Sequence, residues 1–271
     1  MNIIDVSVHN GSINWQKVKE AGIDGAIIRC GYGRDIQRQD DPKFKDNMDG
    51  AIKNGLRVGV YIYSYARNVD GAKSEAQHAL RLCEPYKNNI TLPIYYDLEE
   101  AGTENGAKDR AIAFGDIIEK AGYWCGVYAS LSWWRGCLSG LDRFTKWVAS
   151  WGRNNGLAGE KPNISGVDLW QFTSRGRVNG INGFVDLDKL YREDIKGYKG
   201  ASSSVKPSPD PKEDPKETEP SYELYKIVKG DTLSAISKKY KTTIKAIMAL
   251  NPNIKNKNLI YAGQIIKIPK K

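Results

Sequence analysis

The chain has 271 residues, of which 40% are hydrophobic and 27% are charged, and its formal net charge is +9. This length allows one large domain or two smaller ones, since a domain core commonly forms from about 100 to 200 residues. No apolar run approaches the roughly 20 residues that cross a bilayer, and 7 Trp, 15 Tyr and 5 Phe exclude global disorder. We therefore expect a folded protein without membrane insertion.

Short apolar runs alternate with amphipathic stretches over the first two hundred residues. The runs predict buried strands, and several are continuous, as in parallel strands covered on both faces. Helical spacing predicts helices between them, three of which are followed by a glycine that can end a helix. The expected strands are 3–6, 25–30, 58–63, 92–96, 126–129, 147–149, 168–172 and 184–187, and the expected helices are 15–21, 42–54, 72–83 and 109–121.

Eight strands with intervening helices predict an α/β fold. The arrangement favours a parallel barrel with few helices in its second half. An open, doubly wound sheet is the alternative that the same pattern allows.

A composition change divides the chain. Residues 201–221 read ASSSVKPSPDPKEDPKETEPS, with five prolines and no aromatic residue. Such a stretch buries too little apolar surface to offset its ordering entropy, and its prolines favour extended conformations. We predict a barrel domain at 1–197, a linker at 198–221 and a small domain at 222–271.

The positive charge is not spread evenly along the chain. Residues 1–200 carry 27 basic and 25 acidic side chains, whereas residues 222–271 carry 11 and 2. A uniformly basic body of the kind that binds nucleic acid is therefore not expected. Any contact with a polyanion should involve the C-terminal domain.

Cysteines and histidines are sparse. The chain has four cysteines, none of them in a C-x-x-C pair, and two histidines. This composition argues against a zinc site, and we expect neither a metal nor a cofactor. The cysteines are expected to be buried free thiols.

Acidic residues end three of the expected strands. They are Asp5, Asp97 with Glu99, and Asp186. Catalytic groups of α/β barrels gather where strands end and loops begin. Asp97 and Glu99 are two residues apart, so on an extended chain they share one face and lie about 6 to 7 Å apart. Converging carboxylates separate in pKa, which suits glycosidic cleavage by one protonated acid and one ionised group.

Several segments, taken in order, resemble the lysozymes of glycoside hydrolase family 25. They are DVS at 5–7, GSINW at 11–15, YIYSY at 61–65, DLE at 97–99, WQF at 170–172 and VDL at 185–187. Over residues 1–192 the resemblance implies an irregular, flattened TIM-like barrel that cleaves the β-1,4 bond between N-acetylmuramic acid and N-acetylglucosamine. The family usually has Asp where this chain has Asn14, a departure that leaves the catalytic positions intact.

The resemblance also implies roles for the acids. Glu99 would be the general acid that protonates the leaving oxygen. Asp97 would hold the substrate's 2-acetamido group or stabilise the cationic transition state. Asp5 and Asp186 would complete the acidic cleft.

Aromatic and polar residues are expected to bind the sugar rings. By the resemblance, Tyr63 would donate a hydrogen bond in the cleft. Sugar rings stack their apolar faces on aromatic side chains, while their hydroxyls need polar partners. We expect Trp170 and Gln171, which lie near a strand end, to contact the substrate.

Residues 225–269 resemble a LysM domain, a module that binds N-acetylglucosamine-containing glycans such as peptidoglycan and chitin. The resemblance rests on GDTL at 230–233 and NPNI at 251–254, within an expected βααβ order. Gly230 and Asp231 are expected to form a turn, with Asp231 capping the following helix. The resemblance assigns the sugar groove to Gly230, Asp231, Thr232, Leu233, Asn253 and Ile254.

These features together imply a peptidoglycan hydrolase of the lysozyme or bacteriophage endolysin type, anchored by a LysM module. The expected partners are peptidoglycan glycan strands, N-acetylglucosamine-containing oligosaccharides and, through the basic domain, anionic wall polymers. The start of the chain does not have the pattern of a signal peptide, so we expect it in the host cytoplasm until it is released to act on the cell wall.

Two alternatives remain open, a non-catalytic wall-binding protein and a hydrolase of a related glycan such as chitin. The intact acids argue against the first. The longer D-x-x-D-x-D-x-E run of chitinases is absent, with Ile94 and Tyr95 where earlier acids would stand. Two distant histidines are too few for a zinc amidase, and Cys30 with His9 or His78 lacks a peptidase signature.

Overall fold

The structure is a computed structural model, and it describes residues 1–192, 194–198, 222–228, 230–251, 254, 256, 257, 260 and 264–269. The chain forms two compact units, Met1–Ser208 and Pro209–Lys271. The barrel domain and the small domain predicted from the sequence fall in separate units. Tyr198, where the linker was predicted to begin, still pairs with Tyr123 of the first unit, and the rest of that linker lies outside the described residues.

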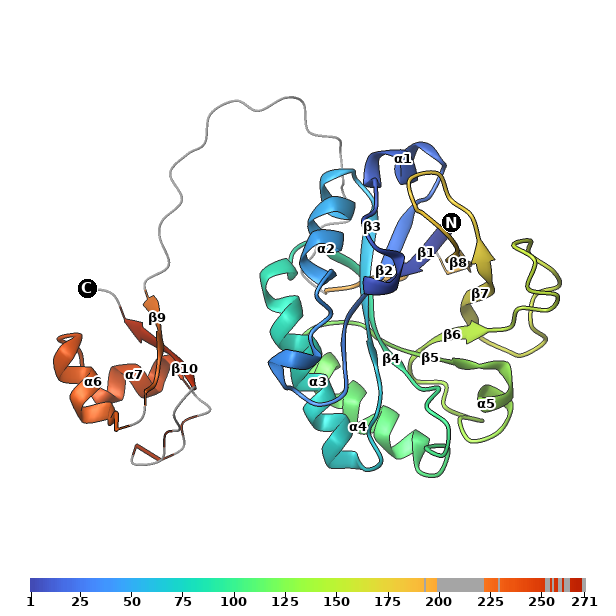
Figure 1. Ribbon diagram of the computed structural model, residues 1–271. Coiled ribbons are helices and arrows are strands. Elements are labelled where there is room, and N and C mark those ends of the chain that lie inside the picture. Colours follow the sequence, from blue (N-terminus) through green and yellow to red (C-terminus); the bar gives the residue numbers. More distant parts are fainter. Residues whose placement is uncertain are drawn as a thin grey trace. The chain divides into compact units, whose positions relative to one another are not determined.

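Eight strands close into one barrel in chain order (Figure 1). All eight overlap the strands expected from the sequence, so the predicted α/β barrel is confirmed and the open sheet is wrong. The strands are β1 (Asn2–Val6), β2 (Gly25–Tyr32), β3 (Arg57–Tyr63), β4 (Ile90–Asp97), β5 (Cys125–Ser130), β6 (Thr145–Ala149), β7 (Val167–Gly176) and β8 (Val185–Leu190).

The direction of the last strand differs from the prediction of an all-parallel barrel. Strands β1 to β7 run parallel to one another, but β8 is antiparallel to both of its neighbours, β7 and β1. Parallel strands need a crossover of about a dozen residues or more, and the segment 177–184 between β7 and β8 is shorter than that. The start of β8 therefore lies at the rim where the other strands end.

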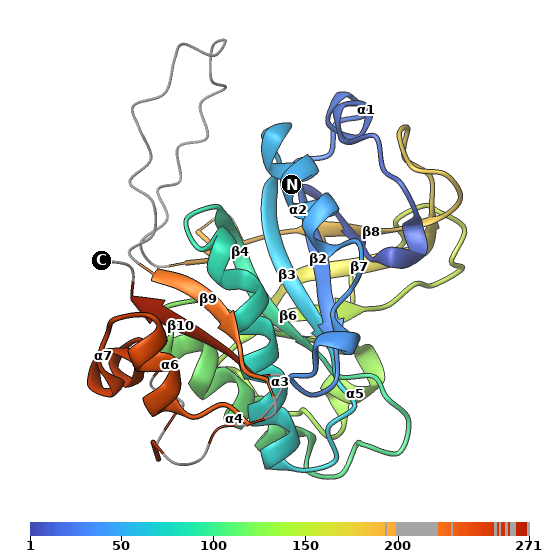
Figure 2. The same cartoon turned by 60° about the vertical axis from the view of Figure 1, so that its left-hand side comes forward.

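Helices cover mainly the first half of the barrel. The first four are α1 (Trp15–Glu20), α2 (Phe44–Lys53), α3 (Val69–Cys83) and α4 (Ala107–Lys120), and each follows one of the strands β1 to β4. Helices α2, α3 and α4 pack along the outside of β2 to β5 (Figures 1 and 2). Beyond β5 the described barrel residues form one further helix, α5 (Leu131–Arg135), which confirms that the second half has few helices.

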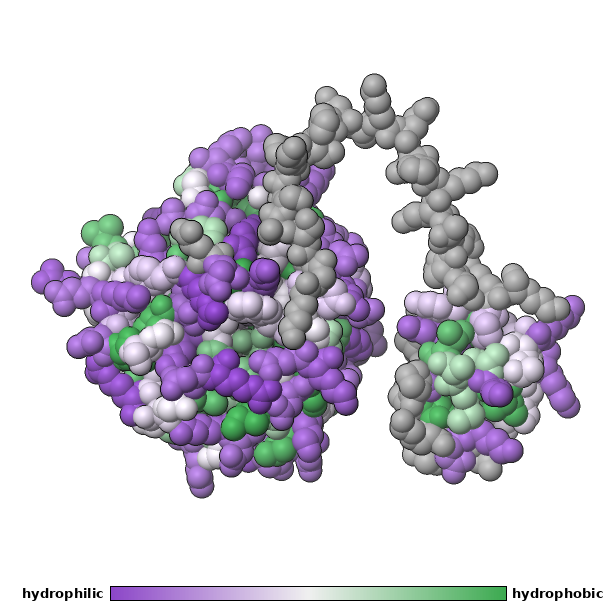
Figure 3. All heavy atoms as spheres, turned by 180° about the vertical axis from the view of Figure 1, so that it is seen from behind, coloured by the Kyte–Doolittle hydropathy of each residue, from purple (hydrophilic) through white to green (hydrophobic). Residues whose placement is uncertain are grey.

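Three single-turn 3-10 helices complete the regular structure of the barrel unit, at Val8–Asn10, Gln37–Gln39 and Glu84–Tyr86. Polar side chains cover most of the face of this unit that Figure 3 shows. Over the described part of the chain, no helix has the length and apolar character needed to cross a membrane.

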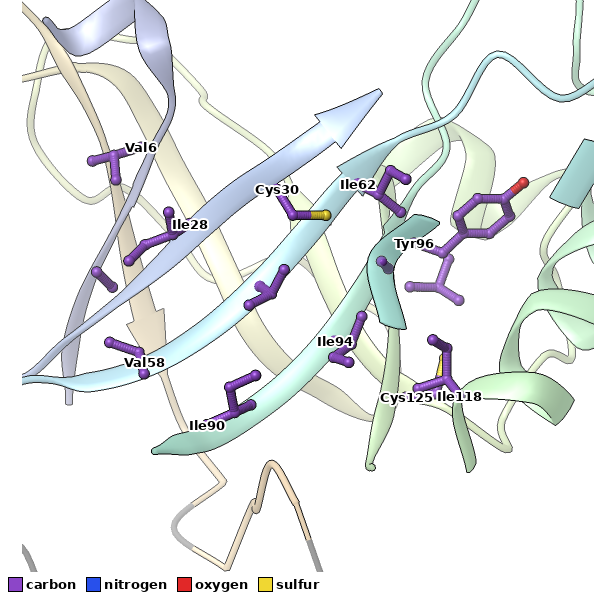
Figure 4. Close-up of a cluster of buried hydrophobic side chains, with 14 of the residues drawn as sticks. Val6, Ile28, Cys30, Val58, Ile62, Ile90, Ile94, Tyr96, Ile118 and Cys125 are labelled. Carbon is purple, nitrogen blue, oxygen red and sulfur yellow. The ribbon is translucent and has the colours of Figure 1, made fainter. Parts of the chain in front are cut away.

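The alternation of side chains along the strands produces two apolar layers. Figure 4 shows part of the outer layer, where Ile28, Val58 and Ile94 point away from the barrel axis. Inside the barrel, the ring of Trp147 contacts the rings of three tyrosines, Tyr61, Tyr95 and Tyr128. These rings form the inner apolar layer together with aliphatic side chains, among them Ile3, Ile27 and Leu92. The cysteines are all free, with Cys30, Cys83 and Cys125 buried and Cys137 half-buried.

The second unit has the βααβ order expected from its sequence. Its elements are β9 (Tyr222–Lys226), α6 (Leu233–Lys239), α7 (Ile244–Leu250) and β10 (Ile265–Pro269). Strands β9 and β10 pair in antiparallel fashion. A small aliphatic core holds the unit together, and it consists of Ile227, Leu233, Ile236, Ile247, Ile254, Ile266 and Ile268.

Candidate active site

A pocket of about 440 Å³ opens at the barrel rim where β1 and β4 end. All four acids predicted from the sequence line it, namely Asp5, Asp97, Glu99 and Asp186. Tyr63 and Gln171 also line it, as expected. The fold thus brings together side chains from β1, β3, β4, β7 and β8.

The end of β4 places two carboxylates in the pocket at different depths. Asp97 is the last residue of the strand and is buried, whereas Glu99 lies just beyond it and is exposed. Leu98 between them is buried in the outer apolar layer, as the alternation of a strand requires. The backbone N–H of Leu98 donates to the carbonyl of Tyr128 at 2.9 Å, which extends the β-type pairing past Asp97. The pair therefore has one deep member and one accessible member.

Burial and a neighbouring negative charge raise the pKa of both carboxyl groups. For Asp97, burial raises the pKa most, the charge of Glu99 raises it further, and Arg29 opposes the shift. For Glu99, partial removal from water raises the pKa, Glu100 adds to this, and the Tyr128 hydroxyl lowers it. Among the described residues, Asp97 Oδ1 is buried and accepts no hydrogen bond.

Asp186 reaches the pocket in a different way from the one predicted. The sequence suggested that it ends a strand, but it is the second residue of β8. Because β8 is antiparallel, its first residues lie at the same rim, and Asp186 pairs in register with Asp5 of β1. Burial and the charge of Glu99 raise the pKa of Asp186 to about 6.

Asp5 lines the pocket and is buried. Its Oδ2 accepts a hydrogen bond from Gln171 Nε2 at 2.8 Å. Burial raises the pKa of Asp5 well above its usual range, and the charges of Asp186 and Asp188 raise it further. Asp5 therefore favours its protonated form more strongly than an exposed aspartate does.

Asp188 is an acid near the site that the sequence reasoning missed. It is 1% exposed, and its Oδ1 accepts a hydrogen bond from Trp147 Nε1 at 2.7 Å. Residues two apart on a strand share a face, so the rule that paired Asp97 with Glu99 also pairs Asp186 with Asp188. The signal was hidden because the expected strand stopped at 187, whereas β8 continues to Leu190.

Trp170 does not lie in the pocket. It is buried in the outer apolar layer, where its Nε1 donates to the carbonyl of Ser150 at 2.9 Å. Gln171, its neighbour, faces the interior, and adjacent strand residues cannot share a face. The pairing of Trp170 with Gln171 as substrate contacts was therefore wrong for Trp170.

Trp151 occupies the place that Trp170 was expected to fill. It lies two residues beyond the end of β6, lines the pocket and is 40% exposed. Its Nε1 donates to Gln171 Oε1 at 2.8 Å, and the Tyr128 hydroxyl donates to the same oxygen at 3.0 Å. The position of Trp151 just past a strand end was the signal that could have identified it.

Tyr63 lines the pocket together with Glu99. Its hydroxyl donates to Glu100 Oε2 at 3.0 Å. The sequence predicted a hydrogen-bond donor at this position but did not single out Glu100. This hydrogen bond therefore joins the last residue of β3 to the residue that follows Glu99.

The loop expected to bind sugar in the second unit uses most of its side chains for folding. Thr232, not Asp231, caps α6 by accepting from the Ala235 N–H at 3.1 Å. Asp231 instead accepts from the Val228 N–H and the Tyr225 hydroxyl, both at 2.9 Å.

The remaining groove residues of the second unit divide into three cases. Leu233 and Ile254 are buried in the core. Gly230 is exposed, with a φ of 98° that favours glycine. Asn253 lies outside the described residues.

Family models match both units. Residues 4–181 match the model described as Glycosyl hydrolases family 25, and residues 225–269 match the model of the LysM domain. The first match covers more than half of the chain. The chain therefore belongs to glycosyl hydrolase family 25, and its second unit is a LysM domain.

Individual relatives agree with both assignments. The chain is 28% identical to Lysozyme M1 of Streptomyces globisporus over 212 residues, which cover 69% of this chain and 66% of that protein. It is 61% identical to an endolysin of Bacillus phage B103 over 44 residues, covering 16% of this chain and 17% of the endolysin. The solved structure of the modular autolysin LytC from Streptococcus pneumoniae is similar with a TM-score of 0.59 and 32% identity. That match covers 70% of this chain and 46% of LytC, so the chain spans less than two thirds of these proteins.

Proposed function

We propose that the chain is an N-acetylmuramidase, a peptidoglycan hydrolase that cleaves the β-1,4 bond between N-acetylmuramic acid and N-acetylglucosamine. The observation that carries this proposal is the convergence of Asp97 and Glu99 with Asp5 and Asp186 in one pocket. Membership in glycosyl hydrolase family 25 and the similarity to a lysozyme and an autolysin support the same reaction.

Glu99 is the general acid in this proposal. It is the accessible member of the β4 pair, so a glycosidic oxygen in the pocket can approach it. Its raised pKa increases the fraction of the carboxyl group that is protonated at a given pH. A positioned, protonated carboxyl group that transfers its proton to the leaving oxygen is the acid that glycoside hydrolysis requires.

Asp97 stabilises the positive charge that develops on the sugar ring. It is buried beside Glu99, where a negative charge acts more strongly than it would in water. The N–H of the substrate's 2-acetamido group is a suitable donor to Asp97 Oδ1, which has no donor among the described residues. Asp97 would then both orient the substrate and offset the charge of the transition state.

Aromatic side chains on two sides of the pocket bind the sugar rings. Trp151 is 40% exposed, and Phe184, just before β8, is 48% exposed. Large exposed aromatic groups in a polar pocket suit the apolar faces of sugar rings, which stack on them. Gln171 holds Trp151 in place through the hydrogen bond to its Nε1.

The LysM unit binds N-acetylglucosamine-containing glycans and so keeps the enzyme on its polymeric substrate. Linking a binding module to a catalytic one raises the local substrate concentration without new contacts in the pocket. The 11 lysines of residues 222–271 add attraction to anionic wall polymers, which salt weakens.

Digestion of purified peptidoglycan followed by borohydride reduction tests the proposal. Borohydride reduces each newly formed reducing end to a sugar alcohol. The proposal predicts muramitol among the hydrolysed products. Glucosaminitol in its place would mean that the other glycosidic bond is cleaved, and no new reducing end would mean that the barrel is not a glycosidase toward this substrate.

A further inference from the structure

Another cavity, of about 320 Å³, lies at the same rim of the barrel as the active site. Its lining residues come from the segments that follow β2 and β3 and from helix α3. Because β2 and β3 run parallel to β1 and β4, these segments leave the barrel at the rim that also carries Asp5 and Asp97. We call this cavity the side pocket. Among the described residues, it shares no lining residue with the active-site pocket.

Two tyrosines connect the side pocket to the active site. Tyr63 lines the active-site pocket with Glu99, and Tyr65 lines the side pocket. The centroids of the two tyrosine rings are 5.0 Å apart, so a single aromatic contact separates the pockets. An extended peptide spans about 3.3 to 3.6 Å per residue. A short peptide attached to a sugar in the active site can therefore reach the side pocket.

Two arginines line the side pocket, Arg34 and Arg67. Both are exposed, and within the described part of the chain neither guanidinium group forms an ion pair. The acids that lie near them in the sequence are paired with other cations. These acids are Asp35 and Asp40, which pair with Arg81, and Asp70, which pairs with Lys73. Arg34 and Arg67 are therefore available to bind an anion from solution.

Glu75, an acid of α3 that lines the side pocket, does not compete for these arginines. It is buried, and its Oε1 accepts from the Tyr65 N–H at 2.9 Å. Its Oε2 accepts from the hydroxyls of Ser64 and Tyr96 at 2.8 and 2.6 Å. Burial raises the pKa of Glu75 above its usual range, which disfavours its negative charge. Glu75 thus holds Tyr65 in place in the pocket wall.

The side pocket also offers apolar surface. Ile36 and Tyr65 line it and are 41% and 49% exposed. Guanidinium groups bind carboxylates through paired hydrogen bonds, so a matching ligand has carboxylate groups next to small apolar groups. A neutral sugar lacks the charge, and a phosphate polymer lacks the apolar groups. A short peptide of small residues with free carboxylates has both.

We propose that the side pocket binds carboxylates of the short peptide that peptidoglycan carries on its N-acetylmuramic acid residues, with Arg34 and Arg67 as the binding groups. The proposal rests on the proposed muramidase function, which brings an N-acetylmuramic acid residue to Glu99. The arginines touch no reacting atom and act on substrate choice. Glycan chains that keep their peptides are then better substrates than chains that have lost them.

Cleavage of two matched substrates by the full chain tests the proposal. One substrate is soluble, uncrosslinked glycan chains that carry their peptides, and the other is the same chains after an amidase has removed the peptides. Both are freed of anionic wall polymers beforehand. In Arg34→Gln and in Arg67→Gln, we expect kcat/KM on the peptide-bearing chains to fall about tenfold, the effect of losing one charge-assisted hydrogen bond. We expect kcat/KM on the peptide-free chains to stay unchanged.

Arg38→Gln is the matched control. Arg38 is an exposed arginine four residues after Arg34, and it does not line the side pocket. The control therefore removes the same charge from the same loop without changing the pocket. We expect it to cleave both substrates as the wild type does.

A binding measurement that needs no cleavage separates the side pocket from the proposed reaction. Calorimetric titration of the full chain with the free, sugar-free stem peptide measures its affinity. We expect binding by the wild type and by Arg38→Gln, and an affinity about tenfold lower in Arg34→Gln and Arg67→Gln. Amidation of the peptide carboxylates should lower the affinity of the wild type in the same way.

The possible outcomes distinguish the two proposals. If neither substrate is cleaved but the peptide binds as expected, the muramidase proposal fails and the side pocket stands. If wild type and pocket variants agree in both measurements, the side-pocket proposal is overturned. It is equally overturned if the pocket variants lose only their binding to walls that carry anionic polymers, because the arginines would then bind phosphate groups.

Discussion

The two regions expected to contact glycan use their side chains in opposite ways. In the barrel pocket, Asp97 and Glu99 have raised pKa values, and Asp97 keeps a buried oxygen without a donor among the described residues. In the LysM loop, Thr232 caps a helix and Leu233 fills the core. Burying ionisable groups costs stability and is a feature of functional sites, whereas caps and core residues add stability. The buried acids of the barrel site therefore serve its chemistry and lower the stability of the fold. In the LysM loop most side chains stabilise the fold, so mainly backbone groups are left to contact a sugar.

Removing a negative charge from the pocket should have the largest effect on activity. Asp97→Asn keeps the size of the side chain but cannot stabilise a cationic sugar. We expect kcat on soluble peptidoglycan fragments to fall by about 100- to 1,000-fold, the usual cost of losing one preorganised electrostatic group. Asp116→Asn is the control, since Asp116 is exposed on α4 and pairs with Arg143. Equal activity of the two variants would remove Asp97 from the mechanism.

The LysM unit should respond to a core change by unfolding. Leu233 is 1% exposed, and Leu233→Ala should cost about 2 to 5 kcal/mol of unfolding free energy. A domain of this size commonly has only about 3 to 5 kcal/mol in total. We expect wall binding to be lost while turnover of soluble fragments is retained, measured by pull-down with purified walls and by kinetics. Normal binding by Leu233→Ala would show that this side chain is not needed for the fold of the unit.

Asp186→Asn should make the barrel more stable above pH 6. The pKa of Asp186 is raised to about 6 in the fold, so the folded state binds its proton more tightly than the unfolded chain does. This contribution to stability is present at low pH and is lost as the pH rises through about 6. Because asparagine carries no charge, we expect the barrel Tm of the variant to exceed that of the wild type by a few degrees, about 2 to 4 °C per kcal/mol, at pH values above this pKa.

The same measurement at low pH supplies the control for Asp186→Asn. Below the unfolded pKa of an aspartate, the wild-type residue is neutral in both states, so the two melting temperatures should converge. A stabilisation of equal size at both pH values would mean that packing, not charge, sets the difference. Calorimetry across this pH range distinguishes the two cases.

Thr232→Ala should have the smallest effect. Loss of the helix cap on α6 should lower the unfolding free energy of the LysM unit by about 1 kcal/mol. Because the hydroxyl is used by the Ala235 N–H, we expect unchanged wall binding under conditions where the unit stays folded. Urea denaturation and a binding isotherm measure the two quantities. Weaker binding without any loss of stability would place the Thr232 side chain in the sugar groove.

The pattern of apolar runs was sufficient to predict the barrel and the acid pair at β4. Continuous buried strands and strand-end carboxylates are local features that a sequence displays directly, and Asp97 with Glu99 followed from strand periodicity alone. The reversed direction of β8 was not predicted, because the apolar run at 184–187 looks the same in either direction. Its length was also underestimated, which hid Asp188.

The wrong predictions for Trp170 and for the helix cap in the LysM loop have a common physical origin. Trp170 and Trp151 are both aromatic residues near strand ends, and composition does not distinguish them. Only the direction of each side chain distinguishes them, since Trp170 lies in the outer apolar layer whereas Trp151 lines the pocket. In the LysM loop, Thr232 and Asp231 are equally good cap residues, and the choice depends on where α6 begins.

The most direct test of the central claim, that Glu99 is the acid of a muramidase site, is the formation of muramitol by Glu99→Gln. Glu104→Gln is the matched control, because Glu104 is an exposed glutamate a few residues along the same loop that does not line the pocket. With equal amounts of protein bound to purified walls, we expect muramitol from the wild type and Glu104→Gln and essentially none from Glu99→Gln. Muramitol formation by Glu99→Gln at the rate of the control would contradict the account.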